Sequence, residues 1–169
     1  LAALVFGGAS PRSLAPGVGA EQSVAVLLEP PLEGPPPSSL RVVAAALPWL
    51  GSPYRLGGSA KSGVDCSGFV AEVLADADLE GAPRRSSSFA SYGSKVKGDI
   101  EPGDILLFGA DNRIDHVGIA LSSSTFIHAA SRGPRTGVII SRLSESSWKR
   151  ELIMARRPSE DVDGSPTSN

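Results

Sequence analysis

Gly51-Ser-Pro-Tyr-Arg-Leu-Gly-Gly-Ser-Ala-Lys-Ser-Gly-Val-Asp-Cys-Ser-Gly-Phe-Val70 is a glycine-rich loop that runs into a predicted helix. It contains Cys66, the only cysteine of this 169-residue chain. Asp65 is a suitable N-cap, and apolar residues recur at helical spacing from Phe69 onward. A cysteine in the first turn of a helix lies beside unpaired backbone N–H groups and the positive end of the helix dipole, and both favour the thiolate. Cys66 is therefore either a reactive thiol or, as is commoner for a single cysteine, a small buried hydrophobic residue.

The composition excludes several classes of protein. Apolar residues make up 41% of the chain, and the formal net charge is −2. This balance indicates a globular protein and offers no basic surface for nucleic acid or an anionic membrane. No apolar run approaches the ~20 residues of a membrane-spanning helix. One cysteine excludes an internal disulfide, and a zinc site built on it and two histidines would need carboxylates. We therefore expect a monomer with no nucleic-acid partner, no transmembrane segment, no metal and no other cofactor.

Three regions of the chain differ in composition. Residues 1–39 hold seven of the 14 prolines, which is typical of an extended linker, although an apolar run at 24–28 could form an edge strand. The first ten residues are apolar and then small, which fits either the remnant of a signal peptide or an unstructured N-terminus. We place the folded domain at residues 40–158 and expect the polar residues 159–169 to be disordered.

Predicted helices precede predicted strands in the folded domain. A first helix is expected from Leu40 with Ser38 or Ser39 as N-cap, and a second from about Cys66 to Leu79. The apolar pattern then changes to period two, with predicted strands at 104–108, 116–121, 125–129, 137–143 and 151–156. This order predicts an α+β fold in which N-terminal helices pack on a central antiparallel β-sheet.

Both histidines of the chain fall on one predicted hairpin, His116 on its first strand and His128 on its second. If Leu121 pairs with Thr125 across the serine turn, His128 lies opposite Gly118, two positions from His116. Residues two apart share a face of a sheet, so the imidazoles become diagonal neighbours about 7–8 Å apart at their backbones. That separation allows one N–H···N hydrogen bond, whereas a register slip of one residue would send the rings to opposite faces.

A thiol at a helix start and two neighbouring histidines suggest nucleophilic catalysis. Cys66 would attack a carbonyl carbon as a thiolate held by His116 as an ion pair, and His116 would then protonate the leaving amine. His128 would orient His116 and select its tautomer. The backbone N–H of Cys66 would bind the oxyanion, and water would hydrolyse the resulting thioester. Each residue also has an ordinary structural explanation, since a single histidine in a strand is more often structural than catalytic.

A non-catalytic alternative is a copper site of the His₂Cys type, formed by the cysteine and both histidines with Met154 as a weak axial ligand. Such sites normally group the cysteine with a histidine and the methionine on one short loop. Here Cys66 precedes its nearest histidine by fifty residues and opens a helix. The spacing therefore favours the catalytic interpretation.

Seven short motifs occur in a familiar order between residues 40 and 158. They are Gly51-Ser-Pro-Tyr-Arg-Leu-Gly-Gly, Asp65-Cys-Ser-Gly-Phe, Pro83-Arg84, Pro102-Gly-Asp-Ile-Leu-Leu-Phe, His116-Val-Gly-Ile, Phe126-Ile-His-Ala and Ala155-Arg-Arg-Pro. Together they resemble the NlpC-type cell-wall endopeptidases, which are bacterial papain-like cysteine peptidases. The segment that follows Arg84 departs from the family pattern, because it lacks an expected glutamine.

This resemblance implies a papain-like fold and hydrolysis of an amide bond in peptidoglycan stem peptides, typically between D-γ-glutamate and the following diamino acid. It implies an extracytoplasmic location in the periplasm, in the cell envelope or outside the cell. Cys66 matches the nucleophile of the family, His116 the base and His128 the third polar member. Tyr54 matches a tyrosine whose hydroxyl lies near the oxyanion and the cysteine.

Two further positions match the family less firmly. Asp65 and Ser67 correspond to residues that, in some members, hold the free amine of an N-terminal L-alanine. The resemblance also leaves other functions open. A different amide hydrolase or acyl transferase on the same fold, such as a secreted effector amidase, would carry the same residues. A relative that only binds wall peptides is the non-catalytic alternative within the family.

Overall fold

The computed structural model of the chain describes residues 36–111 and 113–159. The predictions for the first ten residues, for the apolar run at 24–28 and for the polar tail from residue 160 onward lie outside these ranges. Within them, none of the helices is long and apolar enough to cross a membrane.

Helices and strands alternate little along the described residues, because two helices come first and most strands follow. The helical elements are α2 (Ser38–Ala46), η1 (Leu47–Trp49), α3 (Cys66–Asp76), η2 (Ser86–Ser91) and α4 (Ser146–Glu151). The strands are β1 (Ser59–Ala60), β2 (Gly63–Val64), β3 (Ser94–Lys95), β4 (Ile105–Ala110), β5 (Arg113–Ala120), β6 (Thr125–Ala130), β7 (Gly137–Arg142) and β8 (Leu152–Arg157).

The ends of the two long helices differ from the prediction in one respect each. Pro37 occupies the N-cap position of α2 and makes no side-chain cap, so Ser38 and Ser39 already lie inside the helix and the predicted serine cap is wrong. Proline suits a helix start because it fixes φ and has no N–H to satisfy. The second helix ends before Leu79, because Asp78 adopts left-handed backbone with φ of 59°.

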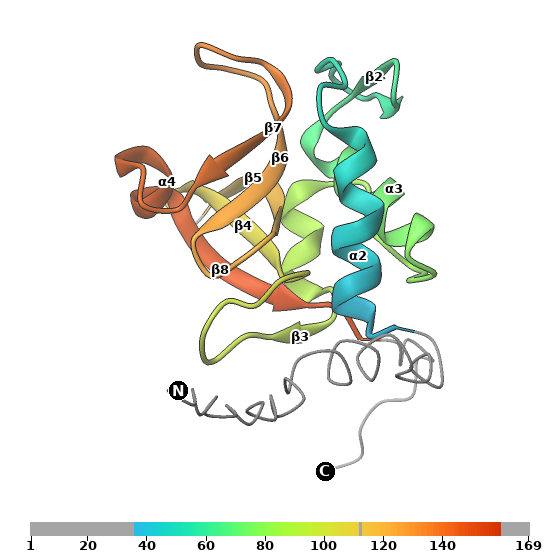
Figure 1. Ribbon diagram of the computed structural model, residues 1–169. Coiled ribbons are helices and arrows are strands. Elements are labelled where there is room, and N and C mark those ends of the chain that lie inside the picture. The colour runs from blue at the N-terminus through green and yellow to red at the C-terminus, as the bar shows by residue number, and fades with distance from the viewer. Residues whose placement is uncertain (1–35, 112, 160–169) are drawn as a thin grey trace, which may run out of the picture. The chain divides into compact units, whose positions relative to one another are not determined.

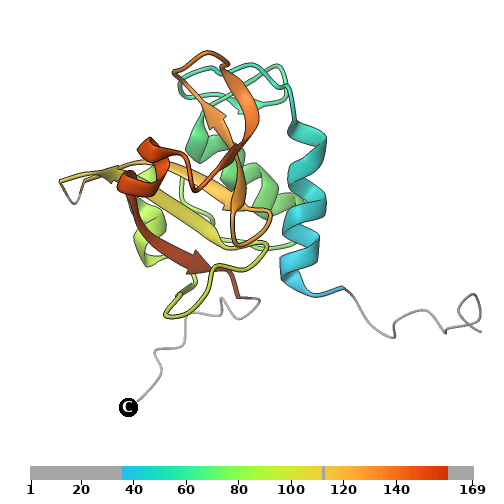
Figure 2. The same cartoon turned by 60° about the vertical axis from the view of Figure 1, so that its left-hand side comes forward.

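Six strands form one antiparallel sheet in the order β3-β8-β4-β5-β6-β7. Strands β4 to β7 are neighbours in chain order, and β8 returns to pair with the free edge of β4. α2 and α3 lie on one side of this sheet and α4 on the other (Figure 1), and the turned view agrees (Figure 2). The predicted α+β fold with helices on an antiparallel sheet is confirmed.

All five predicted strands are present, each with ends within three residues of those expected. The elements that the sequence does not predict are short: three two-residue strands, η2 and α4. Elements of two to six residues contain too few repeats for a hydrophobic period to be recognised.

Alternate residues of the strands face two apolar cores. Ile105 and Leu107 of β4 face the larger core, where they pack with buried residues of α2 and α3. Phe108 and Phe126 face the smaller core on the other side of the sheet. Because side chains alternate along a strand, His116 and His128 share the face of the smaller core.

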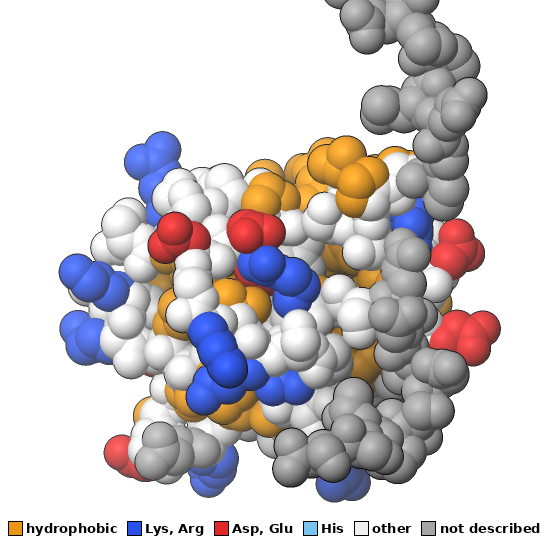
Figure 3. All heavy atoms as spheres, turned by 90° about the horizontal axis from the view of Figure 1, so that it is seen from below, with side chains coloured by type: hydrophobic (Ala, Val, Ile, Leu, Met, Phe, Trp, Pro, Cys, Tyr) orange, Lys and Arg blue, Asp and Glu red, His pale blue; other side chains and the backbone are white. Residues whose placement is uncertain are grey.

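An ion pair with a buried carboxylate joins the start of β4 to the end of β8. The carboxylate of Asp104 is fully buried and accepts hydrogen bonds from Arg157 Nε at 2.8 Å and Nη2 at 3.0 Å. It also accepts the backbone N–H of Glu101 at 2.8 Å, while the Glu101 carboxylate lies 3.1 Å from Arg157 Nη1. Seen from below the view of Figure 1, basic and acidic side chains lie beside one another on the surface (Figure 3). The bidentate contact between Arg157 and Asp104 fixes β8 beside β4.

Candidate active site

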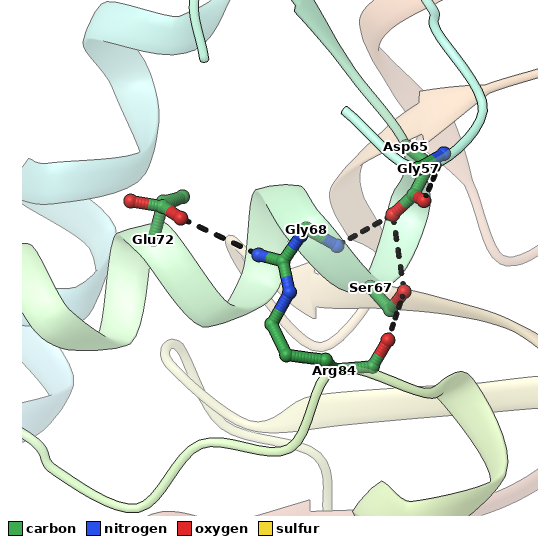
Figure 4. A network of polar contacts seen from close by, with 6 residues as sticks. All are labelled: Gly57, Asp65, Ser67, Gly68, Glu72 and Arg84. Carbon is green, nitrogen blue, oxygen red and sulfur yellow. Dashed lines mark hydrogen bonds and ion pairs between the residues drawn. The ribbon is translucent and has the colours of Figure 1, made fainter. Parts of the chain in front are cut away.

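The first turn of α3 is fixed by the carboxylate of Asp65, which is the predicted N-cap (Figure 4). Asp65 Oδ1 accepts the backbone N–H of Gly68 at 2.6 Å, and Oδ2 accepts that of Gly57 at 2.7 Å. A Cβ on Gly68 would lie 2.2 Å from the carbonyl oxygen of Gly58, so only glycine allows the loop to pack this closely. The glycine loop and the carboxylate together hold Cys66 at the first helical position.

Ser67 ties this turn to the segment that precedes η2. Its hydroxyl lies 3.0 Å from Asp65 Oδ1 and 3.0 Å from the carbonyl oxygen of Arg84 (Figure 4). Arg84 in turn reaches Glu72 one turn further along α3, with 3.3 Å between Nη1 and Oε1. The loop after α3 is thereby held against the start of the helix, next to the thiol.

The thiol of Cys66 is enclosed, with 8% of the residue exposed. Its sulfur lies 3.3 Å from the hydroxyl of Ser86 and accepts the backbone N–H of Val117. Burial raises the pKa of the Cys66 thiol, and the hydrogen bonds from Ser86 and Val117 only partly offset that rise. Burial away from water therefore favours the protonated thiol, in the direction opposite to the thiolate favoured by the helix start.

Replacing Ser86 by alanine is expected to raise the pKa of Cys66 further, because a hydrogen bond that stabilises the thiolate is lost. The rate of alkylation by iodoacetamide, measured against pH, reports on Cys66 alone because the chain has no other cysteine. Its midpoint should move to higher pH in Ser86→Ala. Ser88→Ala is the matched control, since it removes an exposed hydroxyl from the same turn. Equal midpoints in both variants would contradict the role of Ser86.

The two histidines meet as the predicted register requires. Ile119 pairs with Ile127 and Ala120 with Phe126, which places Gly118 opposite His128. His116 Nε2 lies 2.8 Å from His128 Nδ1. A Cβ on Gly118 would lie 3.0 Å from the Cβ of His128, so the glycine makes room for the second imidazole. The hydrogen bond between the rings leaves Nδ1 of His116 for another partner.

A divergence of β5 from β6 opens the sheet at the histidines. The two strands pair only at two positions near the turn. Beyond them, His116 stays paired with Phe108 on β4, and His128 stays paired with Ile139 on β7. The backbone N–H of Val117 is thus free of β6 and donates to Cys66 instead. This opening brings the start of α3 beside histidines that lie on the other face of the sheet.

Trp148 of α4 covers both imidazoles. Its ring stacks on His116 with centroids 5.3 Å apart and meets His128 edge-on at 4.9 Å. Burial lowers the pKa of His116 to about 4, although Asp115 acts against the change. Burial, followed by the nearby His116, lowers the pKa of His128 to about 3. Burial thus favours neutral imidazoles, in the direction opposite to the thiolate–imidazolium ion pair expected from the sequence, and that ion pair stays a prediction.

A cleft of about 540 Å³ gathers these groups. Tyr54, Cys66, His116 and His128 line it together with Trp148 and the loop between β6 and β7. Burial raises the pKa of Tyr54, and the proximity of Cys66 raises it further, so its hydroxyl keeps its proton at neutral pH. A protonated hydroxyl beside the sulfur is a hydrogen-bond donor for a developing oxyanion.

The structure brings four of the six predicted site residues to the cleft. Asp65 and Ser67 lie behind it, in the cap of α3, and their binding of a substrate amine stays a prediction. Among residues 36–111 and 113–159, no group of three or more histidine, cysteine or carboxylate side chains could hold a metal. Met154 packs against the larger core, so the copper alternative has no support in the described residues.

Sequence reasoning missed three residues that shape the site. Ser86 contacts the sulfur, Ser141 contacts His128, and Trp148 covers both histidines. The register argument, extended by one strand to the predicted strand at 137–143, would have placed Ser141 on the histidine face. No periodic signal points to Ser86 or Trp148, which lie on a six-residue 3₁₀ helix and a six-residue α-helix.

Comparisons with known proteins agree with the geometry. The sequence profile of the NlpC/P60 family matches residues 51–157. The chain is 37% identical over 118 residues to murein DD-endopeptidase MepS/murein LD-carboxypeptidase of Escherichia coli K12, a match that covers 69% of this chain and 61% of MepS. It is 40% identical over 113 residues to the probable endopeptidase NlpC of the same strain, covering 64% of this chain and 71% of NlpC. The chain thus spans less than two thirds of the length of MepS.

Solved structures give the same result. An NlpC/P60 family protein from Bacillus cereus ATCC 10987 superposes with a TM-score of 0.65 at 27% identity, covering 73% of this chain and 41% of that one. The NlpC/p60 domain of peptidoglycan hydrolase SagA superposes with a TM-score of 0.60 at 28% identity, covering 70% of this chain and 97% of that domain. The family profile spans more than half of the chain and includes every residue of the cleft, and so the chain belongs to the NlpC/P60 family.

Proposed function

We propose that the chain is a cysteine endopeptidase that hydrolyses amide bonds in peptidoglycan stem peptides, in the cell envelope or outside the cell. One observation carries the proposal: the thiol of Cys66 and the hydrogen-bonded pair His116–His128 line the same cleft. A thiol, a base and a group that orients the base are the parts of a cysteine-nucleophile triad. The names of the relatives MepS and NlpC support an endopeptidase, and that of MepS supports murein as its substrate.

The reaction follows from the proton positions. Cys66 gives its S–H proton to Nδ1 of His116 as the sulfur attacks the carbonyl carbon, and the oxyanion is bound by the backbone N–H of Cys66 and the hydroxyl of Tyr54. His116 then passes that proton to the leaving amine, so the C–N bond breaks and a thioester remains. Water attacks the thioester while His116 takes one of its protons. The C–S bond breaks, and the proton returns to the sulfur as the carboxylic acid leaves.

The pH profile of kcat/KM is expected to be broad. His116 must be neutral to accept the thiol proton, so activity should be lost as the pH falls through about 4. At high pH the thiol ionises beside a neutral imidazole, and no proton remains for the leaving amine. Because burial raises the pKa of the Cys66 thiol, that loss should begin only above the usual titration range of a cysteine thiol. The apparent values belong to the coupled pair.

An alkaline limb between about pH 6 and 8 would contradict this neutral pair, because it would report the loss of an imidazolium. The imidazole ¹⁵N shifts of the free protein at neutral pH provide an independent check.

Asp115 and Arg132 are the charged groups that act on His116, with opposite effects on its pKa. Neutralising either should move the acid limb, downward for Asp115→Asn and upward for Arg132→Gln.

Two bonds are candidates for cleavage. The family resemblance favours the bond between D-γ-glutamate and the diamino acid, and the similarity to MepS favours a D,D cross-link. The decisive experiment incubates the protein with a defined stem tetrapeptide and with a D,D-cross-linked muropeptide dimer, and identifies the products by mass. Release of the dipeptide L-Ala-D-Glu from the tetrapeptide supports cleavage of the first bond. Conversion of the dimer to monomers supports cleavage of the second. If neither substrate is cut under conditions where the protein is folded, the proposal fails.

The same experiment tests the proposed amine site. The carboxylate of Asp65 accepts the backbone N–H groups of Gly57 and Gly68, and the Ser67 hydroxyl lies within hydrogen-bond distance of its Oδ1. A carboxylate has about four acceptor positions, so at least one remains for a substrate amine. A stem peptide with a free L-alanine amine should then be cut faster than its N-acetylated counterpart. Equal rates would remove Asp65 and Ser67 from substrate binding and leave them as the helix cap.

A further inference from the structure

His128 has a second hydrogen-bond partner on the side away from His116. Its Nε2 lies 3.0 Å from the hydroxyl of Ser141 on β7. Phe126 pairs with Ser141 and His128 with Ile139, so Ser141 and His128 are diagonal neighbours on one face of the sheet. Ser141 is 8% exposed and His128 is fully buried. The three side chains therefore form a continuous chain of hydrogen bonds from β5 through β6 to β7.

The direction of donation along these two hydrogen bonds decides whether His116 can act as a base. His116 accepts a proton at Nδ1 only if its Nε2 carries the ring hydrogen and donates it to Nδ1 of His128. Nδ1 of His128 must then be unprotonated, and its Nε2–H must donate to Ser141. In the opposite direction, Ser141 donates to Nε2 of His128, and Nδ1 of His116 already carries a hydrogen. Only the first direction leaves His116 able to take the thiol proton.

We propose that Ser141 is a positioning residue that accepts the Nε2–H of His128 and so holds the histidine pair in the tautomers required for catalysis. The unprotonated Nδ1 of His128 then stays directed at His116 and stabilises the imidazolium formed when Cys66 gives up its proton. No proton moves to Ser141 in any step. The rings of Phe126 and Trp148 pack on His128, stacked at 4.7 Å and edge-on at 4.9 Å, and hold its imidazole in place between His116 and Ser141. This inference rests on the proposed function.

The test compares Ser141→Thr with Ser141→Val, which have the same shape and differ by one hydroxyl. Both β-branched residues suit a strand, so loss of folding should affect them equally. Imidazole ¹⁵N spectra should show one tautomer of His128, protonated at Nε2, in the natural protein and in Ser141→Thr. In Ser141→Val both tautomers should be populated. kcat for muropeptide cleavage should fall by about tenfold in Ser141→Val and recover in Ser141→Thr, with KM unchanged.

The spectra and the rates separate two kinds of failure. The ¹⁵N spectra need no substrate, so they test Ser141 even if the protein cleaves no muropeptide and the proposed function falls. Identical His128 spectra in Ser141→Thr and Ser141→Val would overturn the inference. Equal loss of kcat in both variants would also overturn it, because the hydroxyl would then be irrelevant and Ser141 would matter only for packing.

Discussion

Replacing Cys66 by alanine is expected to lower kcat/KM for muropeptide cleavage by about 10⁴-fold or more, since removal of a nucleophile disables the whole triad. The reason is that no other group in the cleft replaces the sulfur. The hydroxyl of Tyr54 keeps its proton at neutral pH and is therefore a poor nucleophile. His116 and His128 are hydrogen-bonded to each other through Nε2 and Nδ1. The measurement is steady-state hydrolysis of the substrate that the natural protein cuts, with product masses determined.

The fold should survive this change. Cys66 is a small side chain at the edge of the larger core, and the helix start depends on Asp65 and Gly68, which are untouched. Melting temperature and circular dichroism of Cys66→Ala should therefore match the natural protein closely. Cys66→Ser is the second control, because it keeps a hydrogen-bonding group for Ser86 but offers a far weaker nucleophile. Cleavage by a folded Cys66→Ala at the natural rate would eliminate the cysteine mechanism.

The sequence predicts the path of the backbone around the site well. Asp65 is recognisable as an N-cap from its position before an apolar helical pattern, and its side chain caps α3 as expected. The hairpin register follows if Leu121 pairs with Thr125 across the serine turn, and a slip of one residue would turn the apolar residues to the other face. Pairing of Ile119 with Ile127 then brings His116 and His128 together without further information.

The protonation states could not be predicted in the same way. A helix start favours a thiolate through local geometry, which the sequence reveals. The opposing effect is burial. The segment around Ser86 packs against the thiol of Cys66, and Trp148 covers the two histidines; both lie distant from Cys66 in sequence. Electrostatic effects depend on everything within several ångströms, so the sign of a pKa shift emerges only when the tertiary contacts are known.

The same distinction explains why the sequence reveals His128 as an orienting residue but not Ser141. His128 could be identified because it is one of two histidines and falls on a regular strand. Ser141 is one of many serines, and only its position on β7 beside His128 distinguishes it. Common residue types acquire a role through their place in the sheet, whereas rare reactive types already indicate a role in the sequence.

Replacing His116 by glutamine is expected to lower kcat by about 10²–10⁴-fold, the usual contribution of one acid–base group. Glutamine keeps a polar side chain of similar size beside Trp148 but cannot take the thiol proton or protonate the leaving amine. The loss should be smaller for an activated thioester substrate, because its leaving group needs no proton and only the role of His116 as base toward the thiol remains. His128→Gln is the matched variant, because its amide oxygen can still accept the Nε2–H of His116. Its loss of kcat should be smaller than that of His116→Gln on the amide substrate. If the order were reversed, His128 rather than His116 would be the proton carrier, and the direction of the hydrogen-bond chain would have to be reversed with it.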